Sequence, residues 1–174
     1  MWLFLYNDYM KKKSLIKDIL DVVISVCVIT FLLLKFVVFP CEVDGLSMYP
    51  TLNEDDICYS FIFTKNIGID RFDIVVIDTS EKLIVKRVIG LPNDCIEYKN
   101  NQLYVNGELT NEKYLDDVVT EDLSITVPDG EYFCLGDNRT VSRDSRYYGT
   151  FRFDQIRSSH ILVLYPFKNM GFNK

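Results

Sequence analysis

This sequence contains few of the residues and motifs on which many enzymes and binding proteins depend. Its 174 residues include one histidine and no C-x-x-C pair, so a zinc site is not expected. It also lacks H-E-x-x-H, a Walker loop and G-x-S-x-G, which excludes the common zinc peptidases, P-loop nucleotide hydrolases and α/β-hydrolases. With eight glycines, five prolines and no repeat of fixed period, the chain is neither a low-complexity segment nor a repeat array.

Positive charge is also scarce, and it is unevenly distributed. The chain has 19 basic and 25 acidic residues, a net charge of −6, so a basic face for nucleic acid is not expected. Residues 1–40 carry five lysines against three aspartates, a net charge of +2, which leaves −8 on residues 41–174. A small basic, apolar head in front of an acidic body is typical of a membrane-anchored protein.

The head contains one long apolar run. Val22–Phe39 has eighteen residues with a single charge, that of Lys35. As a helix this run is about 27 Å long, close to the roughly 30 Å hydrocarbon thickness of a bilayer. A buried core helix would leave no polar face for water, and a cleaved signal peptide would need small residues before Pro40, which are absent. We therefore expect a permanent transmembrane anchor over residues 19–40.

The lysines of the head predict the orientation of this anchor. Four of them, Lys11, Lys12, Lys13 and Lys17, precede the apolar run. Because basic residues favour the cytoplasmic side, we expect residues 1–18 in the cytoplasm and residues 41–174 outside the cell membrane. The protein would then be single-pass, with the lipid bilayer as one partner.

Cysteine usage leaves two interpretations open. Cys27 lies in the expected anchor, and Cys41, Cys58, Cys95 and Cys134 follow it. In an oxidising compartment these four can form disulfides. They can equally be small buried apolar residues, since most lie in strand-like runs. The sequence does not choose between the two.

After Pro40, short β-branched and aromatic runs replace the helical pattern. Asn106-Gly107 is typical of a two-residue hairpin, whereas the acidic residues 108–122 are expected to form an exposed connection. We predict an all-β body of short antiparallel strands, barrel-like or sandwiched, behind one N-terminal transmembrane helix. The expected strands are Ile57–Phe63, Asp73–Ile77, Leu83–Ile89, Gln102–Val105, Leu123–Val127, Glu131–Leu135 and Ile161–Tyr165.

Two segments of the body present side chains suited to nucleophilic catalysis. In Gly45–Leu52, a glycine and a proline bracket Ser47, which is either a presented hydroxyl or an ordinary surface serine. On the strand that follows Leu83, Lys86 shares a face with apolar neighbours while Arg87 points the other way. A buried lysine has a lowered pKa, and the neutral amine can act as a general base. A strand lysine that reaches to solvent is the alternative.

A third segment and the single histidine complete the candidates. Gly136–Gly149 combines turn residues with two acids and three arginines, which indicates either a loop braced by Arg–carboxylate pairs or a solvated turn. His160 precedes an apolar run and is interpreted as a polar residue at a strand edge.

Together these segments resemble the bacterial type I signal peptidases. Four blocks occur in the family's order: G-x-S-M-x-P-T-L (Gly45–Leu52), D-I-V-V (Asp73–Val76), K-R-V-I-G-L-P-x-D (Lys86–Asp94) and G-D-N-R-x-x-S-x-D-S-R-x-x-G (Gly136–Gly149). Only 41 residues separate the last two blocks, which resembles the compact form found in Gram-positive bacteria. Phe72 and Asn93 stand where the family commonly has glycine.

The resemblance implies a membrane-bound serine endopeptidase that removes signal peptides from secreted preproteins through a Ser–Lys dyad and an acyl-enzyme. By resemblance, Ser47 is the nucleophile and Lys86 the general base. Ser142 would hydrogen-bond the lysine and orient it, and Asp144 and Arg146 would form an ion pair that braces the site. No cofactor and no metal is implied.

The resemblance also implies how substrate binds. The signal peptide would lie extended beside Cys41–Leu46 and Leu83–Val85. Because Gly45 stands where some family members have a serine hydroxyl, a second oxyanion donor besides the Ser47 amide is unassigned. A catalytically inactive, membrane-tethered binding or assembly module is the main alternative; a self-cleaving repressor would need a DNA-binding head, which residues 1–40 do not provide. The expected substrate-binding residues are Val43, Gly45, Met48, Leu52, Ile84 and Val85.

Overall fold

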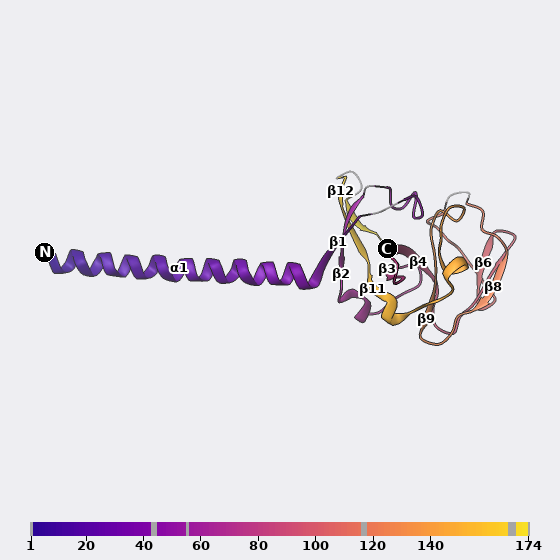
Figure 1. Ribbon diagram of the computed structural model, residues 1–174, viewed down its shortest axis with the longest axis horizontal. Coiled ribbons are helices and arrows are strands. Elements are labelled where there is room, and N and C mark those ends of the chain that lie inside the picture. The colour runs from indigo at the N-terminus through magenta and orange to yellow at the C-terminus, as the bar shows by residue number, and fades with distance from the viewer. Residues whose placement is uncertain (1, 43–44, 55, 116–117, 167–169, 174) are drawn as a thin grey trace. The chain divides into compact units, whose positions relative to one another are not determined.

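The computed structural model describes residues 2–42, 45–54, 56–115, 118–166 and 170–173. The chain divides into two compact units, residues 1–38 and residues 39–174. The first unit is one continuous helix, α1 (Trp2–Val37) (Figure 1). Its described apolar side chains between Leu15 and Leu32 are exposed. Among the residues that the structure describes, no helix is both long and apolar enough to cross a membrane.

The helix ends three residues before the end of the predicted anchor. We expected the anchor to include residues 38–40, but the helix ends at Val37 and the chain continues as strand β1 (Val38–Glu42). Pro40 lies within this strand, which occupies the edge of its sheet. An edge position tolerates proline because the missing N–H has no ladder partner to lose.

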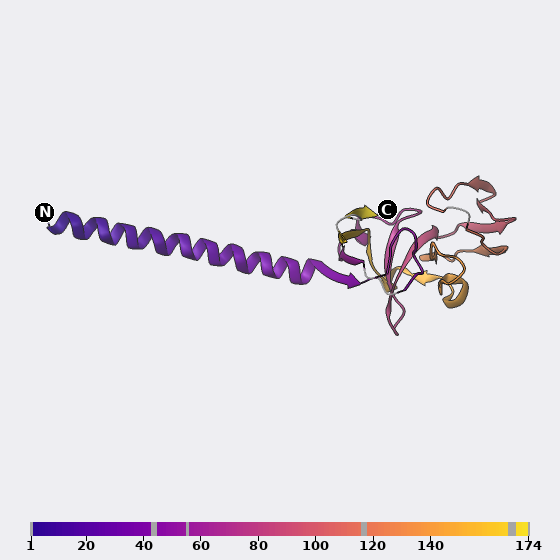
Figure 2. The same cartoon turned by 90° about the horizontal axis from the view of Figure 1, so that it is seen from above.

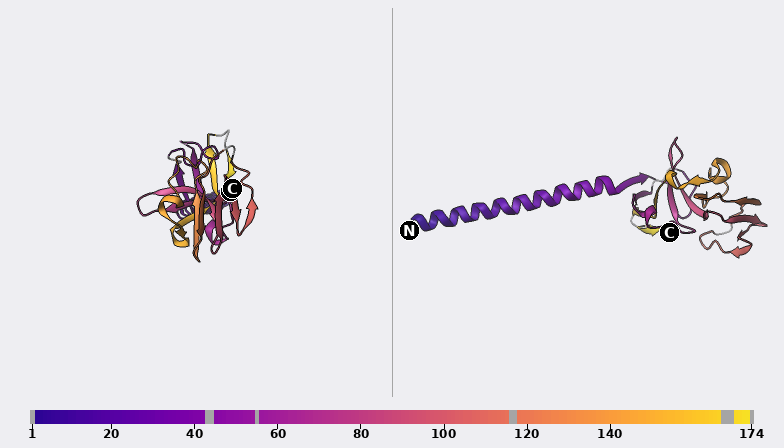
Figure 3. Two further views of the ribbon diagram at one scale, coloured as in Figure 1. Left: turned by 90° about the vertical axis from the view of Figure 1, so that its right-hand side faces the viewer. Right: turned by 90° about the horizontal axis from the view of Figure 1, so that it is seen from below.

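Three sheets build the second unit. Their strand orders are β1-β2-β12-β13, β10-β9-β4-β3-β11 and β7-β6-β5-β8. Figures 2 and 3 show the third sheet at the end of the unit away from the C-terminal strands. The strands after β1 are β2 (Ile57–Phe61), β3 (Ile74–Asp78), β4 (Leu83–Gly90), β5 (Cys95–Lys99), β6 (Gln102–Val105), β7 (Glu108–Thr110), β8 (Leu123–Thr126), β9 (Glu131–Leu135), β10 (Phe151–Arg152), β11 (Ile156–Ser159), β12 (Ile161–Tyr165) and β13 (Gly171–Asn173). The short helices are η1 (Thr64–Asn66), α2 (Ser145–Tyr148) and η2 (Phe153–Gln155).

Strand β3 explains how the sheets share a core. Its run Ile74–Ile77 is apolar at every position, a pattern typical of a strand buried on both faces. Ile74 and Val76 pack in one core cluster with Met48, whereas Val75 and Ile77 pack in another. Because alternate side chains point to opposite faces, one strand anchors two layers and fixes its partner β4 between them.

The mostly β body confirms the predicted strands. Strands β6, β9 and β12 have the predicted bounds, and β2, β3, β4 and β8 differ from theirs by one or two residues at one or both ends. The Asn106-Gly107 hairpin joins β6 to β7, with φ values of 53° and 84° that match a primed turn. Phe72 and Asn93 adopt φ values of 74° and 70°, the conformation that glycine would supply.

The prediction for residues 108–122 was wrong in part. This segment contributes strand β7, and Thr120 is buried with only 2% exposed. The buried Arg139 holds this segment against the core through two hydrogen bonds. Its Nη2 donates to Glu112 Oε1 over 2.5 Å, and its Nη1 donates to Thr120 Oγ1 over 2.7 Å. A buried guanidinium needs a carboxylate partner, so an acidic stretch with little apolar pattern is held against the core.

Candidate active site

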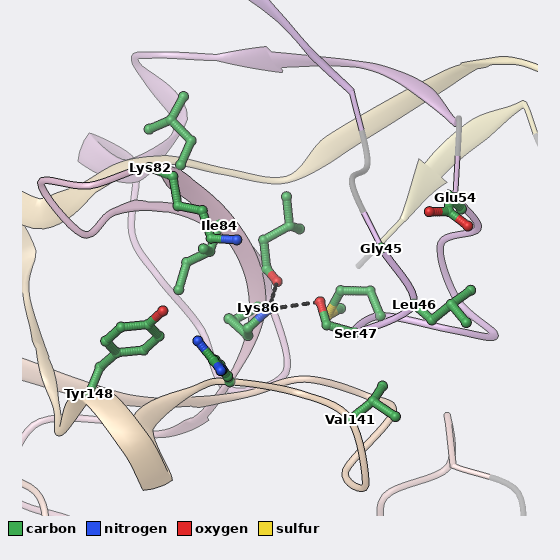
Figure 4. A pocket seen from close by; sticks show the side chains of 13 residues that line it. Gly45, Leu46, Ser47, Glu54, Lys82, Ile84, Lys86, Val141 and Tyr148 are labelled. Carbon is green, nitrogen blue, oxygen red and sulfur yellow. Dashed lines mark hydrogen bonds between the residues drawn. The ribbon is translucent and has the colours of Figure 1, made fainter.

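Ser47 and Lys86 are hydrogen-bonded to each other, although they are 39 residues apart (Figure 4). Ser47 lies in the turn region between β1 and β2, and Lys86 lies in the middle of β4. The Lys86 ammonium donates to Ser47 Oγ over 2.8 Å and to the Val85 carbonyl over 2.7 Å. This arrangement places an amine within proton-transfer distance of a hydroxyl.

The loop that carries Ser47 is fixed by buried neighbours. Met48 and Leu52 are fully buried in the core cluster that includes Ile74 and Val76 of β3. The Leu52 amide donates to the Met48 carbonyl over 2.9 Å, which closes a turn immediately after the serine. Met48 and Leu52 therefore anchor this loop in the core and hold the Ser47 hydroxyl in place.

Lys86 has the environment that a lysine base requires. It shares the apolar face of β4 with Ile84 and Val88, as predicted, and is 3% exposed. The pKa of Lys86 is lowered from 10.5 to about 8, mainly by burial and also by the nearby positive charge of Lys82, while the charges of Asp144 and Asp137 oppose the shift. At pH 7 about one amine in ten is then neutral, against roughly one in 3,000 for an unperturbed lysine.

Asp144 and Arg146 form the predicted ion pair. The Arg146 guanidinium donates to both carboxylate oxygens, Nε to Oδ1 over 2.9 Å and Nη2 to Oδ2 over 2.8 Å. Asp144 also caps α2 and accepts from the Gly136 amide over 3.0 Å. Although burial disfavours the charged form, these donors hold the pKa of Asp144 below its usual value. The pair therefore ties two ends of the loop after β9 together.

Ser142 lies beside the dyad without bonding to it. Its buried Oγ makes no hydrogen bond of normal geometry to any described residue, so the expected bond to Lys86 is not formed in this structure. Gly136 keeps the loop close: a side chain at this position would overlap both Ser142 Oγ and the Ser47 carbonyl. That carbonyl also accepts from the Asn138 amide over 3.0 Å. The third sequence block thus packs directly on the nucleophile loop.

An open cavity of about 500 Å³ contains the hydroxyl–amine pair. Of the expected substrate-binding residues, Gly45, Met48, Ile84 and Val85 line it, Leu52 lies beneath it in the core, and Val43 is outside the described residues. Lys82, Glu54 and Tyr148 also line the cavity, and Figure 4 shows Lys82 and Glu54 on different sides of the pair. The further lining residues are Leu46, Leu83, Val141 and Arg143.

A buried ion pair that we did not predict supports the site from behind. Arg87, on the face of β4 opposite Lys86, donates to both oxygens of Asp137, from Nε over 2.9 Å and from Nη2 over 2.7 Å. The Thr51 hydroxyl, on the nucleophile loop, donates to Asp137 Oδ2 over 2.5 Å. Arg87 also stacks on the Tyr114 ring, 3.9 Å from its centroid. The sequence offered one indication of this pair, because Arg87 directly follows Lys86 in one of the recognised blocks and Asp137 directly follows Gly136 in another.

The cysteines and the single histidine lie outside this site. All five cysteines are free thiols, and Cys58 and Cys134 are buried in the core. His160 follows β11, with Nε2 3.5 Å from Asp73 Oδ1. In the described part of the chain, no three His, Cys, Asp or Glu side chains gather in a way that could hold a metal ion.

Known proteins are similar to this sequence over most of its length. The chain matches the family described as "Signal peptidase, peptidase S26" over residues 16–165. It is 42% identical over 174 residues to signal peptidase I S of Bacillus subtilis strain 168, covering 92% of this chain and 94% of that protein. It is 37% identical over 181 residues to signal peptidase IB of Staphylococcus aureus strain MRSA252, covering 90% and 95%.

A solved structure shares the fold. The crystal structure of a signal peptidase I from Enterococcus faecalis V583 has a TM-score of 0.50 and 34% identity, covering 53% of this chain and 96% of that chain. The class is therefore that of the serine peptidases with a mostly β body. Within it, the chain belongs to the signal peptidase family, peptidase S26.

Proposed function

We propose that this chain is a membrane-bound serine endopeptidase that removes signal peptides from secreted preproteins through a Ser47–Lys86 dyad. The observation that carries the proposal is the 2.8 Å contact between Ser47 Oγ and a buried lysine amine whose pKa is about 8. Family membership supports the substrate class. An inactive binding module would have no need for a costly buried lysine beside a hydroxyl.

The chemistry is acyl transfer in two halves. Neutral Lys86 accepts the proton of Ser47 as Oγ attacks the scissile carbonyl, and the resulting ammonium gives that proton to the leaving amine. Lys86 then takes a proton from water as the water oxygen attacks the acyl carbonyl, and the resulting ammonium returns that proton to Ser47 Oγ as the ester bond breaks. The signal peptide leaves as a free acid, and Ser47 and neutral Lys86 are regenerated. The Ser47 amide is the proposed oxyanion donor. Ser142, Asp144 and Arg146 act as positioning residues, because their loop packs on the nucleophile loop and beside Lys86.

The edge of β4 supports binding of an extended peptide. Strand β3 pairs with β4 from Leu83 to Arg87, but on the other side β9 pairs only with Arg87, Val88 and Gly90. In the described residues, no strand therefore pairs with the start of β4 on the side of the cavity, although the Val85 carbonyl accepts from Lys86 Nζ. A substrate strand can pair there, next to the Ile84 and Met48 side chains that suit small apolar residues.

The rate of cleavage should depend on pH through Lys86. Since only the neutral amine acts as base, kcat/KM should fall about tenfold for each pH unit below the Lys86 pKa of about 8 and level off above it. Cleavage of a preprotein measured from pH 6 to pH 10, with the unfolding temperature checked at each pH, tests this expectation. A profile that is flat between pH 6 and pH 8 would contradict a lysine base.

Membrane attachment is the part of the proposal that rests on α1. Its support is the exposed apolar surface between Leu15 and Leu32, together with the basic residues that precede it. We propose that residues 1–18 face the cytoplasm and that the body lies on the outer side of the membrane. Extraction of membranes with alkaline carbonate should leave the full chain in the pellet; release into the supernatant would oppose an anchor.

Cleavage of a preprotein tests the function as a whole. The full chain, purified in detergent, should convert a synthetic preprotein into two products, and mass spectrometry should find the cut directly after the small residues that end the signal peptide. Binding of the preprotein without turnover at pH 9, where Lys86 is neutral, would favour the inactive binding module.

A further inference from the structure

A second cavity adjoins the one that contains the dyad. Its volume is about 430 Å³, and its apolar lining comes from Phe39, Ile62 and Leu83. Leu83 and Lys82 line both cavities, so the two meet at the start of β4. Ile62 is 43% exposed and Leu83 is 50% exposed, which makes them accessible to an occupant, unlike the core residues beneath.

Two of the four charged residues that line this second cavity, Asp78 and Arg157, are paired with each other. Arg157 Nη2 lies 2.5 Å from Asp78 Oδ2, and the Ser80 amide donates to Asp78 Oδ1 over 2.9 Å. An apolar occupant would therefore leave Asp78 and Arg157 with their partners. The side chains of Glu81 and Lys82, which also line the cavity, are exposed and can keep their charged ends in water. The cavity, which has a polar rim on one side, therefore suits an apolar segment of a peptide.

The spacing between the two cavities matches the layout of a signal peptide. Lys82 precedes Lys86 by four strand residues, which is about 13 Å. A peptide that lies extended along β4 with its scissile carbonyl at Ser47 places its fourth residue from that bond near Lys82 and Leu83. In signal peptides a small-residue site of about three residues precedes the cut, and an apolar region of about 7–15 residues precedes that site.

We propose that the second cavity binds the end of the apolar region of the substrate, directly upstream of its small-residue site. The inference rests on the proposed function and adds a direction: the N-terminal side of the substrate runs from Ser47 toward Leu83. It also gives Ile62, which follows β2 and faces no described core cluster, a role in recognition.

Two substrates and one matched pair of variants test the proposal in detergent. Both substrates contain the same small-residue site and the same eight-residue apolar segment. In the direct substrate the apolar segment adjoins the small-residue site, and in the spaced substrate four serines lie between them. Ile62→Asn should raise KM for the direct substrate about five- to tenfold, as the loss of contacts of one aliphatic side chain produces, with kcat nearly unchanged. The spaced substrate should change less than twofold. Ile67→Asn is the control, because Ile67 is 78% exposed and lines neither cavity.

The outcomes separate the possible failures. An equal rise in KM for both substrates would overturn the proposal. Such a rise would mean that Ile62 acts through the fold or through contact with the detergent micelle, since neither effect depends on the spacing within the substrate. No loss on either substrate would also overturn it. Ile62→Ala, which only shortens the side chain, should show the same preference to a smaller degree, so the test does not depend on how the asparagine variant folds. If the wild type cleaves neither substrate, the proposed function itself fails.

Discussion

Replacement of Lys86 by methionine should lower kcat/KM for a preprotein at least 1,000-fold, with little change in the unfolding temperature. Methionine fills the apolar face of β4 that Lys86 shares with Ile84 and Val88, but it supplies no amine to Ser47. A general base is worth about 100- to 10,000-fold, and residues that act as one unit lose most of their effect when either is removed. Ser47→Ala should therefore be as damaging, and the double variant no worse than either single one.

Exposed residues of the third sheet provide the controls. Ser124 on β8 and Lys99 on β5 are solvent-exposed members of strands that contribute nothing to the cavity, so Ser124→Ala and Lys99→Met should keep full activity. Rates are measured at pH 9, where wild-type Lys86 is mostly neutral. If Lys86→Met or Ser47→Ala stays within tenfold of the wild type, the dyad is not the catalytic unit.

Asp137→Asn should lower the free energy of unfolding by about 3–5 kcal/mol, because it leaves the Arg87 guanidinium buried beside a neutral amide. Arg87 is 1% exposed and Asp137 is fully buried, so water cannot replace the lost charge. For a body of this size the unfolding temperature should fall by roughly 10–18 °C. The variant also removes the acceptor charge for Thr51, which loosens the nucleophile loop.

An exposed ion pair in the same chain is the matched control. Arg152 and Asp154 lie 2.9 Å apart, but their side chains are 63% and 68% exposed. Asp154→Asn should leave the unfolding temperature nearly unchanged, because water screens an exposed surface pair. Thermal unfolding of both variants in the same detergent measures the difference. Equal shifts for Asp137→Asn and Asp154→Asn would show that burial of the Arg87–Asp137 pair has no energetic weight.

The strands most visible in the sequence were those with strong apolar or aromatic runs. β9 and β12 bury alternate or successive apolar side chains, and both have the predicted bounds. β11 escaped prediction because its sequence, IRSS, is polar, yet Ser158 and Ser159 are fully buried. Ser158 is hydrogen-bonded to Ser60, and Ser159 to Thr64. Such burial depends on partners from distant parts of the chain, here β2 and η1, which a local pattern cannot reveal.

The site was predictable only in part, because a local pattern shows which face a side chain lies on but not which distant residue it contacts. The face of Lys86 followed from strand alternation, and the resemblance paired it with Ser47, which no local pattern could do across 39 residues. The Arg87–Asp137 pair spans 50 residues and was missed, although both members lie within the recognised blocks. Leu52 was placed at the substrate but lies in the core, because apolar residues near a nucleophile serve either purpose until packing decides.

The unpaired start of β4 offers a partner only amide and carbonyl groups, which are the same in every peptide. Recognition through them contains no information about side chains, so one such edge can serve a large and varied set of secreted proteins. Discrimination is then left to the few positions next to Ile84 and Met48 and, in our proposal, to the apolar segment that lies at Ile62. Main-chain pairing of this kind excludes one residue, proline, at any substrate position whose N–H must donate to β4, because proline has no backbone N–H. The breadth of the substrate range would thus be a property of the backbone of this enzyme rather than of its side chains.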